Sequence, residues 1–269
     1  MSSDTNIGPL YRHPLPVRLW HWVTVLGVGA SLLTGLLIFN VHPNLYWGDD
    51  GHAGMPTIFS LSASGIDSKA PRYDLQIGAH HWDVTGKIGA IDIEGSDVYV
   101  LIGAPWKDFQ FGATRTWHFL SAWILTGALV WYALYLVLSG RLLHRLCPSA
   151  GELSWRNLTR EIWLHLRLQG PVGAAAEGYN VLQKLSYLLV IFLLIPTLIL
   201  SGLTMSNTVT AVFPDLFSLL GGRQSARSMH FIAAMLMVLF IVVHLVQVLV
   251  VTGWTVAKRG DVATRGDIA

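Results

Sequence analysis

Three apolar segments of the chain open with the same pattern, an arginine followed three residues later by a histidine. The pattern comprises Arg18 and His21, Arg115 and His118, and Arg227 and His230. A fourth histidine, His244, follows His230 by fourteen residues within the same apolar run. Ionisable side chains inside a segment of membrane length are costly and mark functional sites. The four histidines are therefore the first candidates for chemistry.

The arginine and the histidine of each pattern can bind two different parts of one ligand. Residues three apart share a helix face, so each arginine lies one turn nearer the membrane surface than its histidine. Imidazole binds metals, and guanidinium binds carboxylates through charge-assisted, often bidentate hydrogen bonds. Haem presents both targets, an iron that accepts imidazole and propionates at one edge. The pattern predicts haem, with Arg18, Arg115 and Arg227 near propionates.

The spacing of the last two histidines leaves room for two haems. Fourteen residues of α-helix rise about 21 Å and turn to within roughly 40° of four full turns. His230 and His244 therefore share nearly one face of their helix at opposite depths. We expect one haem at each depth, and each haem needs a second axial ligand.

The composition indicates that these segments lie in a membrane. Hydrophobic residues make up 52% of the 269 residues and charged residues 13%, whereas soluble domains carry about 25% charged residues. A hydrocarbon core of about 30 Å requires about 20 apolar residues in a helix. Four segments meet this requirement, at about 17–39, 116–138, 182–204 and 229–251. The sequence predicts an all-α membrane protein, a four-transmembrane-helix bundle formed as a single domain over residues 1–269.

The orientation of the bundle follows from the flanking lysines and arginines, because cytoplasmic loops are enriched in them. The loop 139–181 has five arginines, whereas 205–226 has only Arg223. We therefore place both termini and the loop 139–181 in the cytoplasm, with the chain spanning the cytoplasmic membrane. Segment 40–115 then forms a long extracytoplasmic insert between the first and second helices. Its turn sequences and the strand-like run SDVYVLI predict a small folded cap.

This topology supplies one further histidine at each depth. His21 lies near the cytoplasmic start of the first helix, at the depth of His244. His118 lies near the outer start of the second helix, at the depth of His230. We expect an inner haem between His21 and His244 and an outer haem between His118 and His230. Both would be non-covalent haem b, because the single Cys147 excludes a C-x-x-C-H attachment site.

Other interpretations of the histidines stay open at this point. A single histidine in a membrane helix is often a polar contact between helices, and arginines at helix ends often extend to lipid headgroups. A haem-free channel or transporter could use the histidines as a proton relay. Zinc is a weaker candidate because its histidine sites usually include cysteine or carboxylate ligands, which the four spans lack. The net charge of +2 gives no reason to expect a nucleic-acid partner.

The histidine placement, together with three short segments, resembles the bacterial di-haem cytochrome b561 superfamily. This superfamily includes the b-type cytochromes of nickel–iron hydrogenases and the gamma subunits of formate dehydrogenases. Within it, the chain is most similar to the cytochrome b subunits of the thiosulfate reductase type. The segments that carry the resemblance are HPNLYWGDDG (42–51), YNVLQK (179–184) and GGRQSARSMHF (221–231).

The resemblance implies an electron-transfer and anchoring subunit with no substrate-converting centre of its own. Such a subunit exchanges electrons between quinone and a catalytic partner, here an extracytoplasmic enzyme of the molybdopterin type. An alternative within the superfamily is a stand-alone oxidoreductase that passes electrons to a small acceptor such as superoxide. The long insert argues against this alternative, for which a short outer loop is expected.

In formate dehydrogenase-like members, an N-x-x-Q-K segment at the start of the third helix helps to form a quinone site. The matching residues here are Asn180, Gln183 and Lys184. Their amide and ammonium groups can hydrogen-bond a quinone carbonyl. An equally weighted alternative is a helix cap followed by a lysine that extends to the membrane surface.

Overall fold

The computed structural model of the protein describes residues 14–52, 54–65, 71–93, 96–100, 111–167 and 180–266. Four helical segments in these ranges are long and apolar enough to cross a membrane: Leu15–Val41, Gly112–Leu138, Val181–Met205 and Arg223–Val250. Many of their large apolar side chains are exposed, as expected of helices that face lipid; Leu26, for example, is 73% exposed. The predicted bundle of four membrane-spanning helices is confirmed.

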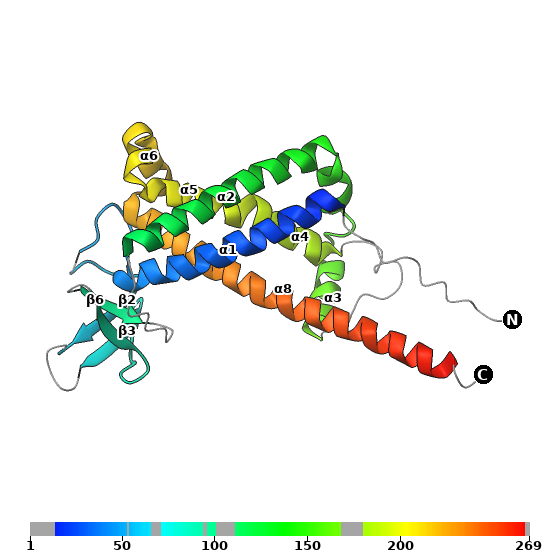
Figure 1. The fold of residues 1–269 in the computed structure, drawn as a ribbon, viewed down its shortest axis with the longest axis horizontal. Coiled ribbons are helices and arrows are strands. Elements are labelled where there is room, and N and C mark those ends of the chain that lie inside the picture. The colour runs from blue at the N-terminus through cyan, green and yellow to red at the C-terminus, as the bar shows by residue number, and fades with distance from the viewer. Residues whose placement is uncertain are drawn as a thin grey trace. The chain divides into compact units, whose positions relative to one another are not determined.

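Three of the spans are regular helices, α1 (Leu15–Val41), α2 (Phe111–Leu138) and α8 (Arg223–Gly266) (Figure 1). The third span contains a π-helical turn, because α4 (Val181–Leu189) continues through η3 (Val190–Leu194) into α5 (Ile195–Met205). Pro196, near the start of α5, has no N–H to donate to the preceding turn. The wider π turn accommodates this missing donor without ending the helix.

Shorter helices lie between the spans. η1 (Leu142–Leu146) and α3 (Trp155–Leu166) follow α2, while α6 (Asn207–Val212) and α7 (Asp215–Leu220) separate α5 from α8. Gly221 ends α7 with a φ of 68°, a left-handed conformation in which glycine has no steric penalty. The chain therefore reverses sharply just before α8 begins.

The insert between α1 and α2 is built from strands in its described residues. β1 (Asn44–Leu45), β2 (Phe59–Ser64), β3 (Arg72–Ile77) and β4 (His80–Asp83) form an antiparallel sheet in that order. β5 (Gly89–Ile93) pairs with β6 (Ser96–Val100) as a separate hairpin. β6 covers most of the run SDVYVLI that predicted a strand. The all-α class thus holds for the membrane part, and the insert adds β structure to it.

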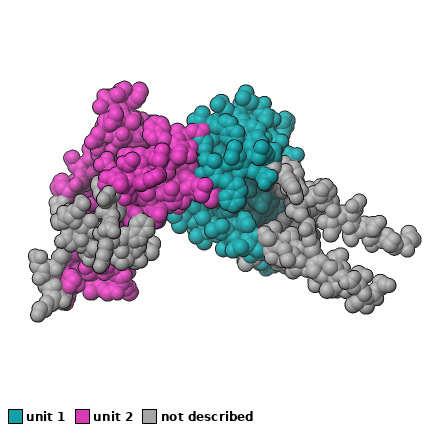
Figure 2. Space-filling model, in the orientation of Figure 1, with its two compact units in different colours: residues 1–23, 128–191, 238–269 teal, residues 24–127, 192–237 magenta. Residues whose placement is uncertain are grey.

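The contacts divide the chain into two compact units, which Figure 2 shows in teal and magenta. Unit 1 comprises Met1–Val23, Ala128–Ile191 and Val238–Ala269, and unit 2 comprises Thr24–Gly127 and Phe192–Met237. Each unit therefore combines stretches of several spans. His21 and His244 belong to unit 1, whereas His118 and His230 belong to unit 2.

Each unit has its own aromatic and apolar core. In unit 1, Tyr132, Leu136, Leu146 and Ile191 form a buried cluster, and Trp20 stacks on Tyr132 with ring centres 4.0 Å apart. In unit 2, Phe39 near the end of α1 stacks on Phe231 of α8 at 4.3 Å and lies 5.8 Å from Phe59 of β2. This second cluster joins the insert to two of the spans.

Candidate functional site

The structure brings the four histidines together in two pairs, in the combination expected from the sequence. The rings of His118 on α2 and His230 on α8 have centres 6.1 Å apart and planes 63° apart. The rings of His21 on α1 and His244 on α8 have centres 6.4 Å apart and planes 53° apart. Each pair joins α8 to a different span.

The distances within the pairs suit a metal held between two imidazoles. With metal–nitrogen bonds of about 2.0 Å, and each ring centre roughly another 1 Å behind its nitrogen, the centres would be on the order of 6 Å apart. Within the described residues, no third His, Cys, Asp or Glu joins either pair to form a group of three ligands. Both pairs therefore fit a metal that brings its other ligands with it, as the iron of haem does.

His118 is held from α1 by a hydroxyl and a glycine. The Oγ1 atom of Thr34 lies 3.0 Å from the Nδ1 atom of His118. The same hydroxyl donates to the backbone carbonyl of Ala30 at 2.6 Å, so it accepts from the imidazole N–H. A Cβ atom at Gly35 would lie 3.2 Å from Cε1 of His118, a tight contact. The ring packs directly against the α1 backbone, which leaves Nε2 as the nitrogen that could bind a metal.

His230 has the same kind of surroundings, supplied by α5. The Oγ atom of Ser201 lies 3.0 Å from Nδ1 of His230 and donates to the carbonyl of Thr197 at 2.5 Å. A Cβ atom at Gly202 would lie 3.5 Å from Cε1 of the ring. Nε2 of His230 is again the nitrogen left for a metal.

The pair in unit 1 has aromatic neighbours instead. Trp22 meets the ring of His21 edge-on at 5.4 Å, and Phe240 stacks on His244 at 5.6 Å. In the part of the chain that the structure describes, a hydroxyl partner to a ring nitrogen is seen at His118 and His230 but not at His21 or His244. The two pairs thus share a spacing but differ in what orients the imidazoles.

The three arginines of the repeated pattern have different surroundings. Arg18 is exposed on the first turn of α1. The Arg115 guanidinium lies 5.7 Å from the ring centre of Phe119. Arg227 donates from Nη2 to the backbone carbonyl of His42, just after α1. Partial burial, followed by the nearby positive charge of Arg227, lowers the pKa of His42. Arg227 thus helps to fix the end of α1, and propionate binding by the three arginines stays a prediction.

Hydrogen bonds join two of the segments singled out in the sequence, 42–51 and 221–231. The backbone N–H groups of Gln224 and Ser225 donate to the carbonyl of Gly48 at 3.0 and 3.1 Å. Gly48 N–H donates to Ser225 Oγ at 2.8 Å, and Ser228 Oγ donates to the carbonyl of Tyr46 at 2.5 Å. The first N–H groups of a helix have no partner inside it, so these bonds fix where α8 begins. They thereby set the position of Arg227 and His230.

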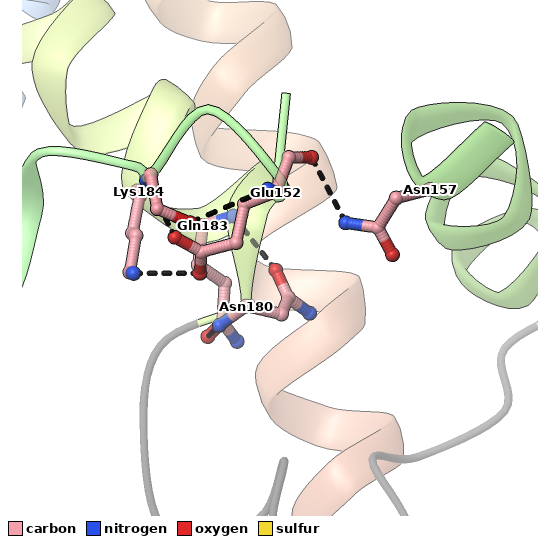
Figure 3. Close-up of polar contacts among 6 residues, drawn as sticks. Glu152, Asn157, Asn180, Gln183 and Lys184 are labelled. Atoms are coloured by element: carbon pink, nitrogen blue, oxygen red, sulfur yellow. Dashed lines mark hydrogen bonds and ion pairs between the residues drawn. The ribbon is translucent and has the colours of Figure 1, made fainter. Parts of the chain in front are cut away.

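The predicted quinone residues lie at the N-terminus of α4, where Figure 3 shows them as sticks. Asn180 Oδ1 accepts from the Gln183 N–H at 2.8 Å, and Gln183 Oε1 accepts from the Asn180 N–H at 3.2 Å. This reciprocal pair is a capping box, which satisfies two donors of the helix end. Lys184 Nζ lies 2.7 Å from Glu152 Oε1. All three side chains therefore have a structural role: Asn180 and Gln183 form the cap, whereas Lys184 pairs with Glu152 and is not the surface-directed lysine of the cap interpretation.

Two residues that sequence reasoning missed complete this cluster, Glu152 and His165. The hydrogen bond from Lys184, followed by that from the Ser149 N–H, lowers the pKa of Glu152 to about 2. His165 Nδ1 donates to the carbonyl of Glu161 at 2.8 Å, and its Nε2 lies 3.3 Å from Asn180 Nδ2. The Asn180 amide is thus the donor of this last contact. Neither residue belongs to a spacing pattern that could have identified it.

Comparison with known proteins places the chain among membrane cytochromes. A model of the prokaryotic cytochrome b561 family matches residues 12–259 of the chain. A protein of Azospira oryzae that bears the name of a protein-methionine-sulfoxide reductase subunit, YedZ1, is 36% identical over 141 residues. These residues cover 52% of this chain and 67% of that protein. No solved structure matches.

Proposed function

The chain belongs to the prokaryotic cytochrome b561 family, and on that premise we propose that it is a di-haem electron-transfer subunit of a respiratory oxidoreductase. It would bind one haem b between His21 and His244 and a second between His118 and His230. The observation that carries the proposal is the equal spacing of the two pairs, with ring centres 6.4 and 6.1 Å apart. Each pair offers two imidazoles and no third protein ligand in the described residues.

In this proposal the residues of the chain bind the haems and orient their axial ligands. The four imidazoles supply the axial ligands, and Gly35 leaves space for the ring of His118. Arg18, Arg115 and Arg227 supply positive charge for the propionates. Bound haem b contributes one-electron exchange at its iron, at a potential set by axial ligands, burial and neighbouring charge.

Quinone is the proposed redox partner near the start of α4. Asn180 Nδ2 and Lys184 Nζ carry hydrogen-bond donors that can serve a quinone carbonyl, and Gln183 fixes the cap around them. These residues and the His21–His244 pair belong to the same compact unit, unit 1. The pair in unit 1 is therefore the proposed site of electron exchange with quinone.

The catalytic partner is proposed to lie outside the cytoplasm and to be of the molybdopterin type. The relative named as a reductase subunit supports the role of a subunit that works with a catalytic protein. The distribution of arginines supports an inner-membrane topology with both termini in the cytoplasm. The insert 40–115 would then lie on the side of the partner.

A spectrum of the purified protein tests the proposal. We expect b-type bands after reduction with dithionite and two haems per chain by pyridine haemochromogen assay. His118→Ala and His230→Ala should each remove the same spectral component, and His21→Ala and His244→Ala should each remove the other. His165→Ala serves as a control, because this histidine belongs to neither pair, and both components should persist.

Two results would contradict the proposal. Absence of b-type bands from protein expressed with sufficient haem would favour a channel or transporter with a histidine relay. Loss of one common component in His21→Ala and His118→Ala would show that the histidines pair differently from the structure.

A further inference from the structure

The same two-residue arrangement supports both histidines of unit 2. Thr34 and Gly35 on α1 contact the ring of His118, and Ser201 and Gly202 on α5 contact the ring of His230. In each case a hydroxyl lies 3.0 Å from Nδ1 and the next residue is a glycine facing Cε1. Two different spans thus support an imidazole ring in the same way, with a hydroxyl at Nδ1 and a glycine at Cε1.

The direction of each hydroxyl is fixed by its own helix. Thr34 donates its only hydroxyl proton to the Ala30 carbonyl, and Ser201 donates its proton to the Thr197 carbonyl. The oxygen lone pairs then face the imidazole, which must contribute the proton of the Nδ1–H···O bond. Ser201 is fully buried, so water does not compete for this bond. Both rings are held in the tautomer that leaves Nε2 free for iron.

The glycines set how closely each ring approaches the helix. A methyl group at Gly35 would lie 3.2 Å from His118 Cε1, close enough to require the ring to move. At Gly202 the corresponding distance to His230 Cε1 is 3.5 Å, an ordinary van der Waals contact. The two sites therefore differ in how much they tolerate a methyl group.

We propose that Thr34–Gly35 and Ser201–Gly202 are positioning pairs that fix the axial imidazoles of the haem in unit 2 and lower its reduction potential. The inference rests on the proposed di-haem function and extends it to residues outside the histidine set. The His21–His244 pair, which has aromatic neighbours and no such hydroxyl in the described residues, does not receive this contribution. The two proposed haems therefore differ in the hydrogen bonding of their axial imidazoles.

The direction of the effect follows from the chemistry of the imidazole ligand. A hydrogen bond from the distant ring nitrogen to an acceptor makes the coordinating nitrogen a stronger electron donor. A stronger donor stabilises ferric more than ferrous iron, and the reduction potential falls. Removing the hydroxyl should therefore raise the potential of the haem in unit 2 and leave the other unchanged.

The test is a potentiometric titration of the purified holoprotein, followed in the visible bands and by electron paramagnetic resonance of the ferric haems. Thr34→Val and Ser201→Ala remove the hydroxyls with little change of volume. Thr126→Val and Thr204→Val are matched controls, because among the described residues the hydroxyls of these threonines bond only to the carbonyls of Ala122 and Leu200 in their own helices. Thr34→Ser and Ser201→Thr keep a hydroxyl and should retain the wild-type potential.

At a fixed potential, we expect the ratio of reduced to oxidised haem in unit 2 to rise on the order of threefold for each hydroxyl-free variant. The double variant should reach about tenfold, which corresponds to 59 mV for a one-electron couple. The His118→Ala spectrum identifies which component belongs to unit 2. Gly35→Ala should change the resonance signal of the same haem more than Gly202→Ala, because its methyl group is closer to the ring.

Unchanged potentials in Thr34→Val and Ser201→Ala, with both haems present, would overturn the inference. If a hydroxyl-free variant loses the haem of unit 2, retention in Thr34→Ser and in the two control variants would support positioning. Equal loss in the controls would instead overturn it. Failure of the proposed function is distinct, since it would appear as missing b-type bands in the unmodified protein.

Discussion

At the scale of the residue, Asn180 combines two properties that one substitution can separate. Its Oδ1 atom caps α4 by accepting from the Gln183 N–H, while its Nδ2 atom is the donor proposed for quinone. Alanine would remove both and cost about 1 kcal/mol of helix stability. Serine keeps a capping oxygen and removes the amide together with its contact to His165 Nε2, so it tests the amide apart from the cap.

Asn180→Ser should therefore slow quinol-dependent haem reduction by roughly fivefold, as expected for the loss of one hydrogen bond worth about 1 kcal/mol. Stopped-flow reduction by a quinol analogue measures this rate, and dithionite reduction should proceed as in the wild type. Asn157→Ser is a matched control, because the Asn157 side chain belongs to the same cluster through its Nδ2 donation to the Glu152 backbone carbonyl at 2.9 Å. A normal quinol rate in Asn180→Ser, with a slow rate in Asn180→Ala, would assign Asn180 to the cap alone.

The histidine pairs could be predicted at this scale, whereas their supports could not. Helix geometry alone gives the relative depth and face of His230 and His244 from their spacing, and it does not depend on neighbouring helices. Thr34 and Ser201 carry no such signal, because a hydroxyl in an apolar helix commonly bonds to its own backbone four residues earlier. Which of these hydroxyls faces a histidine depends on the rotation of each helix about its axis, and the apolar pattern of a lipid-exposed span does not specify that rotation.

At the scale of the element, one ion pair links the segment before α3 to the start of α4. The Glu152 carboxylate accepts from Lys184 Nζ and, through its other oxygen, from the Ser149 N–H at 2.7 Å. These bonds depress the pKa of Glu152 from 4.5 to about 2. A depressed pKa means that the stabilisation is fully present above pH 4.5 and is lost as the pH falls toward 2.

Glu152→Gln should accordingly lower stability by about 0.5–1 kcal/mol, as is usual for a partly exposed pair. Thermal loss of haem absorbance measures it, and the difference from the wild type should stay constant between pH 5 and 8. Below pH 4.5 the difference should shrink. Glu161→Gln, on α3, makes the same change of charge away from the pair and is the control. A difference that varies between pH 6 and 8 would mean that another group titrates with Glu152.

Long elements with a regular apolar pattern could be predicted, whereas short elements could not. The four spans follow from apolar runs, and the cap of α4 follows from the N-x-x-Q pattern. In the insert, sequence reasoning predicted one strand-like run, which forms β6, and missed the sheet, because β1 to β4 are two to six residues long and are defined by pairing between strands. The π turn η3 was also missed, since Pro196 alone is compatible with a kink, a break or a wider turn.

At the scale of the whole molecule, the proposed topology can be tested with the chain's single cysteine. Cys147 is exposed and lies in the loop that the arginines place in the cytoplasm. A membrane-impermeant maleimide should label it in inverted membrane vesicles and not in intact spheroplasts. Cys147→Ser is the blank, and Lys87→Cys in that background should be labelled in spheroplasts, since Lys87 is exposed in the insert. The reverse pattern would invert the topology.

Biosynthesis imposes an order on this architecture. The supported histidine pair of unit 2 requires Thr34 from the first span, His118 from the second, Ser201 from the third and His230 from the fourth. The other pair also depends on the last span, through His244. Neither proposed haem site is complete until α8 has left the ribosome and entered the bilayer, so in this proposal cofactor loading follows membrane insertion. A chain that ends before α8 would lack His230 and His244, so His21 and His118 would have no second axial ligand. In this proposal only the fully translated chain binds haem.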